Sequence, residues 1–149
     1  MEYYYHITRK DWPKQIRLLP RTGGKFRGFM ETKTARICVC PTPAHCFIAI
    51  PYVEGGDMNI YRTLRKCNIK EPIGVLDSCV TLEKWRVEPT WFIKIGSVSP
   101  ELYKQMELST IVGSVWGMDR QREALARVER LLAHYGFNYG YGNSRKEQR

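Results

Sequence analysis

The chain has 149 residues, of which 43% are hydrophobic and 12% aromatic, and its formal net charge is +9. These values are typical of one globular domain with a single core, and they argue against extended disorder before the last dozen residues. No apolar run approaches the roughly 20 residues of a membrane span, the start lacks a signal-peptide pattern, and five cysteines without a CxxC pair do not favour a disulfide framework. We therefore expect a cytoplasmic protein that does not bind membranes.

The positive charge is concentrated toward the two ends of the chain. Residues 1–28 hold seven basic and two acidic side chains, and residues 119–149 hold seven and four. A surface of that sign attracts polyanions over about 8–10 Å, so nucleic acid, a dinucleotide and an acidic protein all come into consideration as partners. The alternative is a solvated basic face that aids solubility.

The first half of the chain alternates strand and helix patterns. Aromatic and β-branched residues predict a strand over 3–8, and a short helix is expected over 10–18 with Pro13 in its first turn. A basic, glycine-rich loop follows over 20–28. A strand over 35–40 then leads into a helix that Thr42 caps and that runs through about residue 50.

The second half is expected to supply most of the sheet. Strands are predicted over 59–64, 74–76, 83–87 and 90–98, and Ser99 is expected to cap a short helix. Apolar residues at three- and four-residue spacing predict an amphipathic helix over 119–135, ended by Gly136. We expect one domain over residues 1–137 and a mobile basic tail over 138–149.

The first candidate for chemistry is the pair His6 and Thr8 on the first predicted strand. A spacing of two places both side chains on one face, where they can hydrogen-bond a ribose or a phosphate. The same H-x-T tripeptide occurs in two-histidine phosphodiesterases, but those enzymes need the motif twice. A hydrolase that uses His6 with Lys or Arg partners ranks lowest, because no second histidine motif or aspartate cluster accompanies it.

The second candidate is the strand-to-helix turn between Arg36 and Thr42. Backbone N–H groups at a helix start favour an anion, and Arg36 would reinforce such a site unless it pairs with Glu31 on the surface. With His45 and Cys46 nearby, Cys38 and Cys40 can be imagined around zinc. Their spacing is unlike that of zinc ligands, so we expect buried, apolar cysteines and no metal site.

The third candidate is the alternating segment that begins at Thr81. On a strand, Thr81, Glu83 and Trp85 share one side. A carboxylate between a hydroxyl and an indole can hydrogen-bond a ribose and stabilise developing positive charge. The alternative is an exposed glutamate that pairs with a neighbouring lysine.

Taken together, these parts resemble the ADP-ribosyltransferase-like superfamily over residues 3–98. The resemblance lies in their order: His6 and Thr8 on a first strand, Arg36 opening a strand-turn-helix, Tyr61 on a middle strand, and Thr81 with Glu83 late. It implies an α+β fold in which a split, bent antiparallel β-sheet with flanking helices forms a cleft for NAD. It also implies that His6 with Thr8 contacts the adenosine ribose and that Glu83 is the catalytic residue beside the nicotinamide ribose.

One position departs from the family pattern. Where the histidine-containing branch has a tyrosine that stacks on nicotinamide, this chain has residues 37–40, so Tyr52 or Tyr61 would have to substitute. The resemblance therefore predicts NAD-dependent ADP-ribosyl transfer to a macromolecule, with Glu83 catalytic and the cofactor bound by His6, Thr8, Arg36, Thr42, Tyr61, Thr81 and Trp85.

The alternative function is a basic binding protein without catalysis. A phage or mobile-element protein that inhibits a nucleic-acid-handling or host-defence complex would have this size and charge. Its partner would be a host protein or nucleoprotein, or nucleic acid bound through the basic ends, with Tyr139 and Tyr141 of the tail stacking on bases.

Overall fold

The computed structural model describes residues 1–22, 34–49, 56–75, 77–111 and 117–137. Its strands are β1 (Tyr5–Thr8), β2 (Gln15–Leu18), β3 (Ile37–Val39), β4 (Met58–Thr63), β5 (Lys84–Arg86) and β6 (Thr90–Val98). Its helices are α1 (Pro43–Ala49), α2 (Ser78–Thr81), α3 (Pro100–Gln105) and α4 (Gly117–Tyr135), with a 3₁₀ turn at Leu108–Thr110. Within these residues, no helix is both long enough and apolar enough to cross a membrane.

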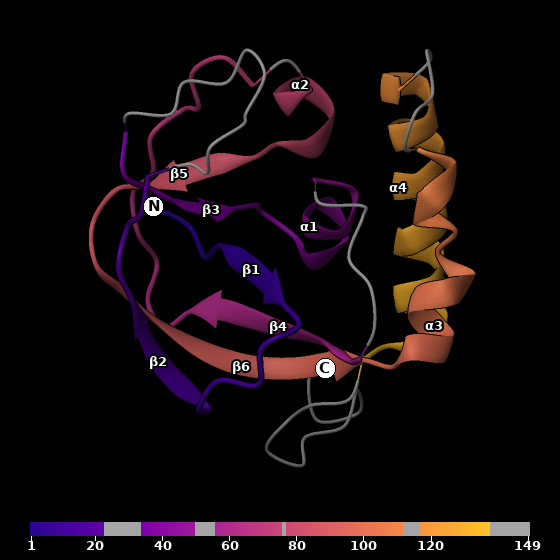
Figure 1. The fold of residues 1–149 in the computed structure, drawn as a ribbon, viewed down its shortest axis with the longest axis horizontal. Helices are drawn as coiled ribbons and strands as arrows, with labels where there is room; N and C mark the ends of the chain where they lie inside the picture. The colour runs from indigo at the N-terminus through magenta and orange to yellow at the C-terminus, as the bar shows by residue number, and fades with distance from the viewer. Residues whose placement is uncertain (23–33, 50–55, 76, 112–116, 138–149) are drawn as a thin grey trace.

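The strands form an antiparallel sheet that is split between β1 and β3. A four-stranded part has the order β1-β4-β6-β2, and a two-stranded part pairs β3 with β5. Between β1 and β3, the two parts are joined by the residue pair Tyr5 and Cys40, whose backbone N–O distances are 2.8 and 3.0 Å. Figure 1 shows β6, β4, β1, β3 and β5 succeeding one another up the view. The expected α+β class with a split, bent antiparallel sheet is therefore confirmed.

The sheet curls back on itself at its β2 edge. Arg21, three residues beyond β2, exchanges backbone hydrogen bonds of 3.1 and 2.9 Å with Arg36 at the start of β3. The strands thus enclose an inner core, which consists of Ile37, Val39, Tyr61 and Phe92 with Tyr4, Trp12, Ile16, Leu18 and Ile69 packed against them. Because successive side chains of a strand point to opposite faces, the neighbours of these residues form a second, outer face.

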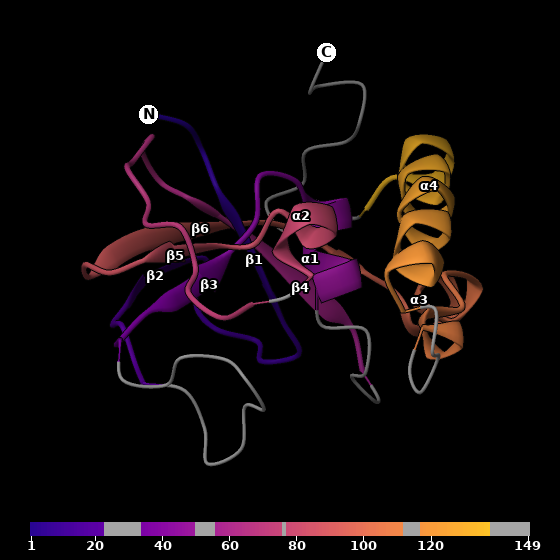
Figure 2. The same ribbon diagram turned by 90° about the horizontal axis from the view of Figure 1, so that it is seen from above.

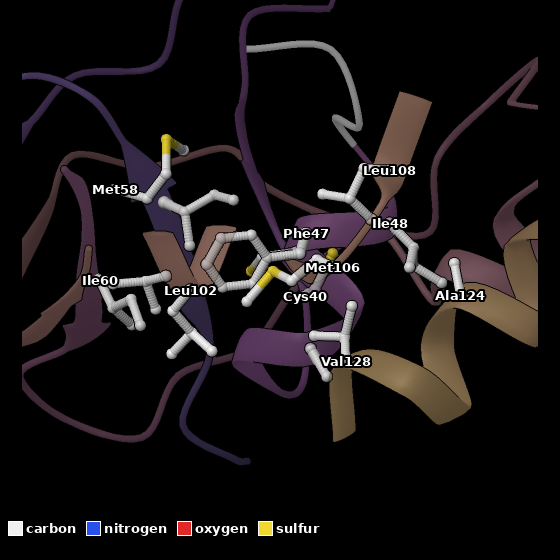
Figure 3. Packing of buried hydrophobic residues seen from close by; sticks show 14 of the residues in the cluster. Cys40, Phe47, Ile48, Met58, Ile60, Leu102, Met106, Leu108, Ala124 and Val128 are labelled. Carbon is white, nitrogen blue, oxygen red and sulfur yellow. The ribbon is translucent and has the colours of Figure 1, made fainter. Parts of the chain in front are cut away.

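The outer face packs against the helices in a larger, helix-side core. Phe47 and Ile48 of α1 lie at its centre, and Ala124 and Val128 of α4 approach them (Figure 3). All four are fully buried, and burying a side chain the size of Val128 contributes about 1.5–3 kcal/mol. Both ribbon views place α3 and α4 at the end of the molecule opposite β2 (Figures 1 and 2).

The expected helix over 10–18 is wrong, because this segment contains strand β2. Ile16 and Leu18 point into the inner core while Gln15 and Arg17 are exposed, so the period is two residues and not 3.6. Leu19, which was expected on the helix face, is exposed. The spacing of Trp12, Ile16 and Leu19 was misleading because only Ile16 and Trp12 reach the core.

The expected short strand over 74–76 is also absent from its described residues, 74 and 75. Gly74 has φ 75°, a conformation that turns the chain, and helix α2 follows. The strands expected over 3–8, 35–40, 59–64, 83–87 and 90–98 are observed, as are the helices capped by Thr42 and Ser99 and the long C-terminal helix. The expected tail, 138–149, lies outside the described residues.

Candidate functional site

Strand β3 and its partner β5 bring together three of the side chains that the sequence singled out, Arg36, Glu83 and Trp85. On the outer face of β3 lie Arg36, Cys38 and Cys40, which alternate with the inner-core residues of the same strand. Cys38 stands directly opposite Trp85 of β5, so these two side chains share the outer face. We use the name outer cluster for Arg36, Cys38, Glu83 and Trp85.

Trp85 is the centre of the outer cluster. Its ring is fully buried, and its Nε1–H donates a hydrogen bond of 3.0 Å to Oε2 of Glu83. The guanidinium carbon of Arg36 lies 4.3 Å from the centroid of the Trp85 ring, which is a cation–π contact. Arg36 and Glu83 are only 6% and 8% exposed, so both charged groups are held where water screens them little.

A tight turn between α2 and β5 positions Glu83. Leu82 ends the helix in the left-handed conformation, with φ 55°, and its N–H bonds the carbonyl of Ser78 at 2.9 Å. The hydroxyl of Thr81 then accepts the backbone N–H of Glu83 at 3.2 Å. Thr81 is therefore buried in α2, not on the strand as expected, and it orients Glu83 through the backbone.

The start of α2 is tied to the long helix. Nε2 of Gln121, a buried residue of α4, donates a hydrogen bond of 2.7 Å to Oδ2 of Asp77, the residue that precedes α2. This contact joins the helix at the end of the chain to the turn that carries Glu83. Asp77 also lies close enough to Glu83 to raise its pKa by repulsion between the two carboxylates.

Burial raises the pKa of Glu83 above the usual range of a carboxyl group. The Trp85 hydrogen bond, the positive charge of Arg36 and a hydrogen bond from Cys38 oppose that rise, whereas Asp77 adds to it. The result is a fixed carboxyl group that can accept a hydrogen bond from a hydroxyl or exchange a proton. Glu83 is not the exposed, lysine-paired residue of the alternative interpretation.

The thiol of Cys38 is protonated at neutral pH. Burial of the sulfur, followed by the negative charge of Glu83, raises the pKa of Cys38 to about 11. The residue as a whole keeps solvent exposure, so the expectation that both strand cysteines are buried is wrong for Cys38 and right for Cys40. A thiol with this pKa is a hydrogen-bond donor to Glu83 and a poor nucleophile.

His6 lies on the inner side of the split, not in the outer cluster. Its Nδ1 is 2.8 Å from the carbonyl oxygen of Cys38, and because a carbonyl only accepts, we assign the proton to Nδ1. The ring stacks on Trp12 at 6.0 Å between centroids and 12° between planes. Burial lowers the pKa of His6 despite the bond to Cys38, which favours the charged form.

The other predicted cofactor residues form hydrogen bonds within the protein. The hydroxyl of Tyr61, a fully buried residue, donates to the carbonyl of Trp12 at 2.8 Å. Thr42 caps α1, accepting the N–H of His45 at 3.2 Å and contacting its Nδ1 at 2.6 Å. Thr8 accepts the N–H of Lys10 at 3.1 Å. None of these bonds involves a residue of the outer cluster, and Tyr52 lies outside the described residues.

Cys38 and Asp77 were not predicted from the sequence as neighbours of Glu83. Strand alternation placed Cys38 on the side of Arg36, but only the pairing of β3 with β5 brings it opposite Trp85. Asp77 carried no separate signal, because the turn after α2 is needed to bring it back toward Glu83. Among the described residues, no group of three His, Cys, Asp or Glu side chains is arranged to hold a metal ion.

No protein-family model, curated protein or solved structure matches this chain significantly. Its function therefore has to be inferred from the residues and their geometry.

Proposed function

We propose that the protein binds NAD beside the outer cluster and transfers ADP-ribose to a macromolecule, with Glu83 as the catalytic residue. The observation that supports this most is the buried Glu83 carboxyl group, which Trp85 holds from one oxygen at 3.0 Å. A carboxylate fixed in advance can stabilise developing positive charge without first reorganising water. The proposal rests on this geometry together with the sequence resemblance.

The adjacency of three strands supports the same proposal. The resemblance implies that a first-strand histidine and a late-strand glutamate both contact NAD in the cleft of a split, bent sheet. In this fold β3 precedes α1, pairs with β5 along its length and meets β1 at Cys40. Arg36 and Glu83, which are far apart in the sequence, thereby both contact Trp85, Arg36 over the face of its ring and Glu83 at the Nε1–H edge.

NAD would supply an activated ribose whose bond to nicotinamide breaks to give an oxocarbenium-like centre. The carboxylate of Glu83 would accept a hydrogen bond from a ribose hydroxyl and stabilise the positive charge electrostatically. Arg36 would offer its cation to a phosphate, held at the ring of Trp85. Electrostatic stabilisation by a single fixed group of this kind is worth about 10²–10³ in rate.

His6 takes a positioning role in this proposal. Its Nδ1–H is engaged by the carbonyl of Cys38, and its ring is on the inner side of β3 while Glu83 is on the outer side. The imidazole of His6 thus forms a hydrogen bond from β1 to β3 where the backbones of these two strands have separated. Thr8, Thr42 and Tyr61 are likewise engaged in hydrogen bonds within the protein. NAD contacts are therefore assigned to Arg36 and Glu83 with Trp85 beneath them.

Release of nicotinamide from NAD, measured by chromatography, tests the proposal. Glu83→Gln keeps the acceptor for the Trp85 N–H but removes the charge, so we expect release to fall roughly 10²–10³-fold. Glu71→Gln is the matched control, because Glu71 is exposed and pairs at 2.8 Å with Lys84, the residue that follows Glu83 at the start of β5. Equal release by wild type and Glu83→Gln, or no NAD-induced rise in melting temperature for either, would contradict the proposal.

The alternative proposal is a non-catalytic binding protein. One observation favours it: among the described residues, no buried side-chain nitrogen or oxygen lacks a hydrogen-bond partner. A cluster satisfied from within can be a structural device alone, since ion-pair networks also shift pKa values. On that alternative, Glu83→Gln changes stability but leaves partner binding unaltered.

A further inference from the structure

A groove lies at the end of the molecule away from α4, separate from the outer cluster. Its volume is about 540 Å³, within the range of ligand sites in proteins. The described residues that line it are Gln15, Leu64, Arg65, Lys66, Cys67, Arg86, Pro89, Thr90 and Trp91, and none of these is acidic. The groove therefore combines an apolar floor with a basic rim.

Trp91 presents an open aromatic surface in this groove. It is 50% exposed, although it lies within the central strand β6, whose neighbours Thr90 and Phe92 are buried. Arg17 stands directly opposite it on β2, so an exposed cation lies beside the exposed ring. Its exposed apolar area is available to a ligand, and tryptophan is a residue that interfaces favour.

The basic rim is available for an external anion. Within the described part of the chain, neither Arg65 nor Lys66 forms an ion pair with an acidic side chain. Lys66 lies 5.7 Å from the ring of Tyr3, a second exposed aromatic side chain. The backbone N–H of Leu64 bonds the carbonyl of Trp91 at 2.8 Å, which fixes the basic pair next to the indole.

Arg86 makes the floor of the groove rigid. Its guanidinium donates to the Thr90 hydroxyl at 2.7 Å and to the Asn68 carbonyl at 2.9 Å, and it pairs with Glu88 at 3.3 Å. This set of bonds holds the turn between β5 and β6 in place. Arg65 and Lys66 therefore lie beside a part of the chain that the bonds of Arg86 hold rigid.

We infer that this groove binds single-stranded nucleic acid, with a base stacked on Trp91 and backbone phosphates at Arg65 and Lys66. Aromatic rings stack on any unpaired base, and unpaired cations beside them neutralise the adjacent phosphates. A single strand fits better than a duplex because only an unpaired base can lie flat on the indole. Arg65 and Lys66 lie outside the two basic ends of the chain that were considered above for nucleic acid, whereas Arg17 beside Trp91 belongs to the N-terminal one.

Fluorescence anisotropy of a labelled oligothymidylate of about 12 nucleotides tests this inference. We expect Trp91→Ala to weaken binding roughly 5- to 150-fold, which corresponds to the 1–3 kcal/mol of one stacked base. Trp91→Phe, which keeps an aromatic face, should retain most of the affinity and shows that the site is intact. Arg65→Ala should make the slope of log K against log salt shallower by about 0.7, the value of one phosphate contact.

The matched control is Arg130→Ala, because Arg130 is an exposed arginine on α4 at the other end of the molecule. It should bind the oligonucleotide with the affinity and salt slope of the wild type. Equal binding by Trp91→Ala and wild type would overturn the inference. So would equal affinity for a duplex or a mononucleotide, or competition by polyglutamate as strong as by the oligonucleotide, which would assign the groove to an acidic protein.

Discussion

Replacing Trp85 with phenylalanine tests the arrangement of the outer cluster, because it removes the indole N–H and keeps an aromatic ring. The carboxyl group of Glu83 then loses the donor at 3.0 Å in a site that is only 8% exposed. A hydrogen bond to a charged group contributes about 1.5–3 kcal/mol, and we expect a loss of that size in the free energy of unfolding near pH 8. The weaker contact of Arg36 with a phenyl ring adds to it.

The loss should depend on pH with a defined sign. Because the folded-state pKa of Glu83 is raised, its protonated form contributes to the free energy of unfolding. This contribution is fully present below the unfolded-state pKa of about 4.5 and is lost as the pH rises through the folded-state pKa. The Trp85 bond is the largest of the contributions that lower this pKa, and removing it raises the pKa further. Trp85→Phe should therefore be more destabilising at pH 8 than at pH 5.

Urea unfolding at both pH values, followed by circular dichroism, measures the difference. Trp91→Phe is the control, because Trp91 is exposed and carries no comparable bond, and it should change stability by less than about 0.5 kcal/mol. If the destabilisation by Trp85→Phe is the same at pH 5 and pH 8, the bond between the indole and Glu83 does not influence ionisation, and the reasoning about this carboxyl group is refuted.

Two further predictions concern His6 and Cys38. The folded-state pKa of His6 is lowered, so its contribution to the free energy of unfolding is present above the unfolded pKa of about 6.5 and is lost as the pH falls. His6→Asn, whose amide can still donate to the Cys38 carbonyl, should therefore flatten the decline in stability between pH 7 and pH 5. Urea titrations at the two pH values measure this. The negative charge of Glu83 helps to raise the pKa of Cys38 to about 11. Glu83→Gln should therefore lower the midpoint pH of Cys38 alkylation by iodoacetamide, which mass spectrometry measures. An unchanged midpoint would show that Glu83 does not influence the ionisation of Cys38.

Local patterns explain how much of the fold could be predicted. Strand β6 and helix α4 follow from periodicity within the segment itself, and the caps at Thr42 and Ser99 from side chains that bond the next turn. Strand β2 was missed because its four residues are too few to outweigh a misleading spacing of Trp12, Ile16 and Leu19. Its strand conformation comes from pairing with β6, a contact that its own sequence does not contain.

The candidate site, like the fold, was predictable where it depends on local alternation and unpredictable where it depends on long-range pairing. The sharing of one side by Glu83 and Trp85 was predictable from alternation, and their hydrogen bond agrees with it. The contact of Arg36 with Trp85 depends on the register of β3 against β5, which is a long-range property. The bond of His6 to the Cys38 carbonyl depends on the separation of β1 from β3, and it could not be foreseen from an H-x-T tripeptide.

The alternation of β3 between two cores has a consequence for the evolution of the chain. Ile37 and Val39 fill the inner core, while Arg36 and Cys38 serve the outer cluster. Inserting or deleting one residue in this strand would exchange the two sets, burying a guanidinium among aromatic rings and turning isoleucine toward Glu83. We therefore expect insertions and deletions only in the loops between strands, whereas residues 36–40 should change during evolution by substitution alone.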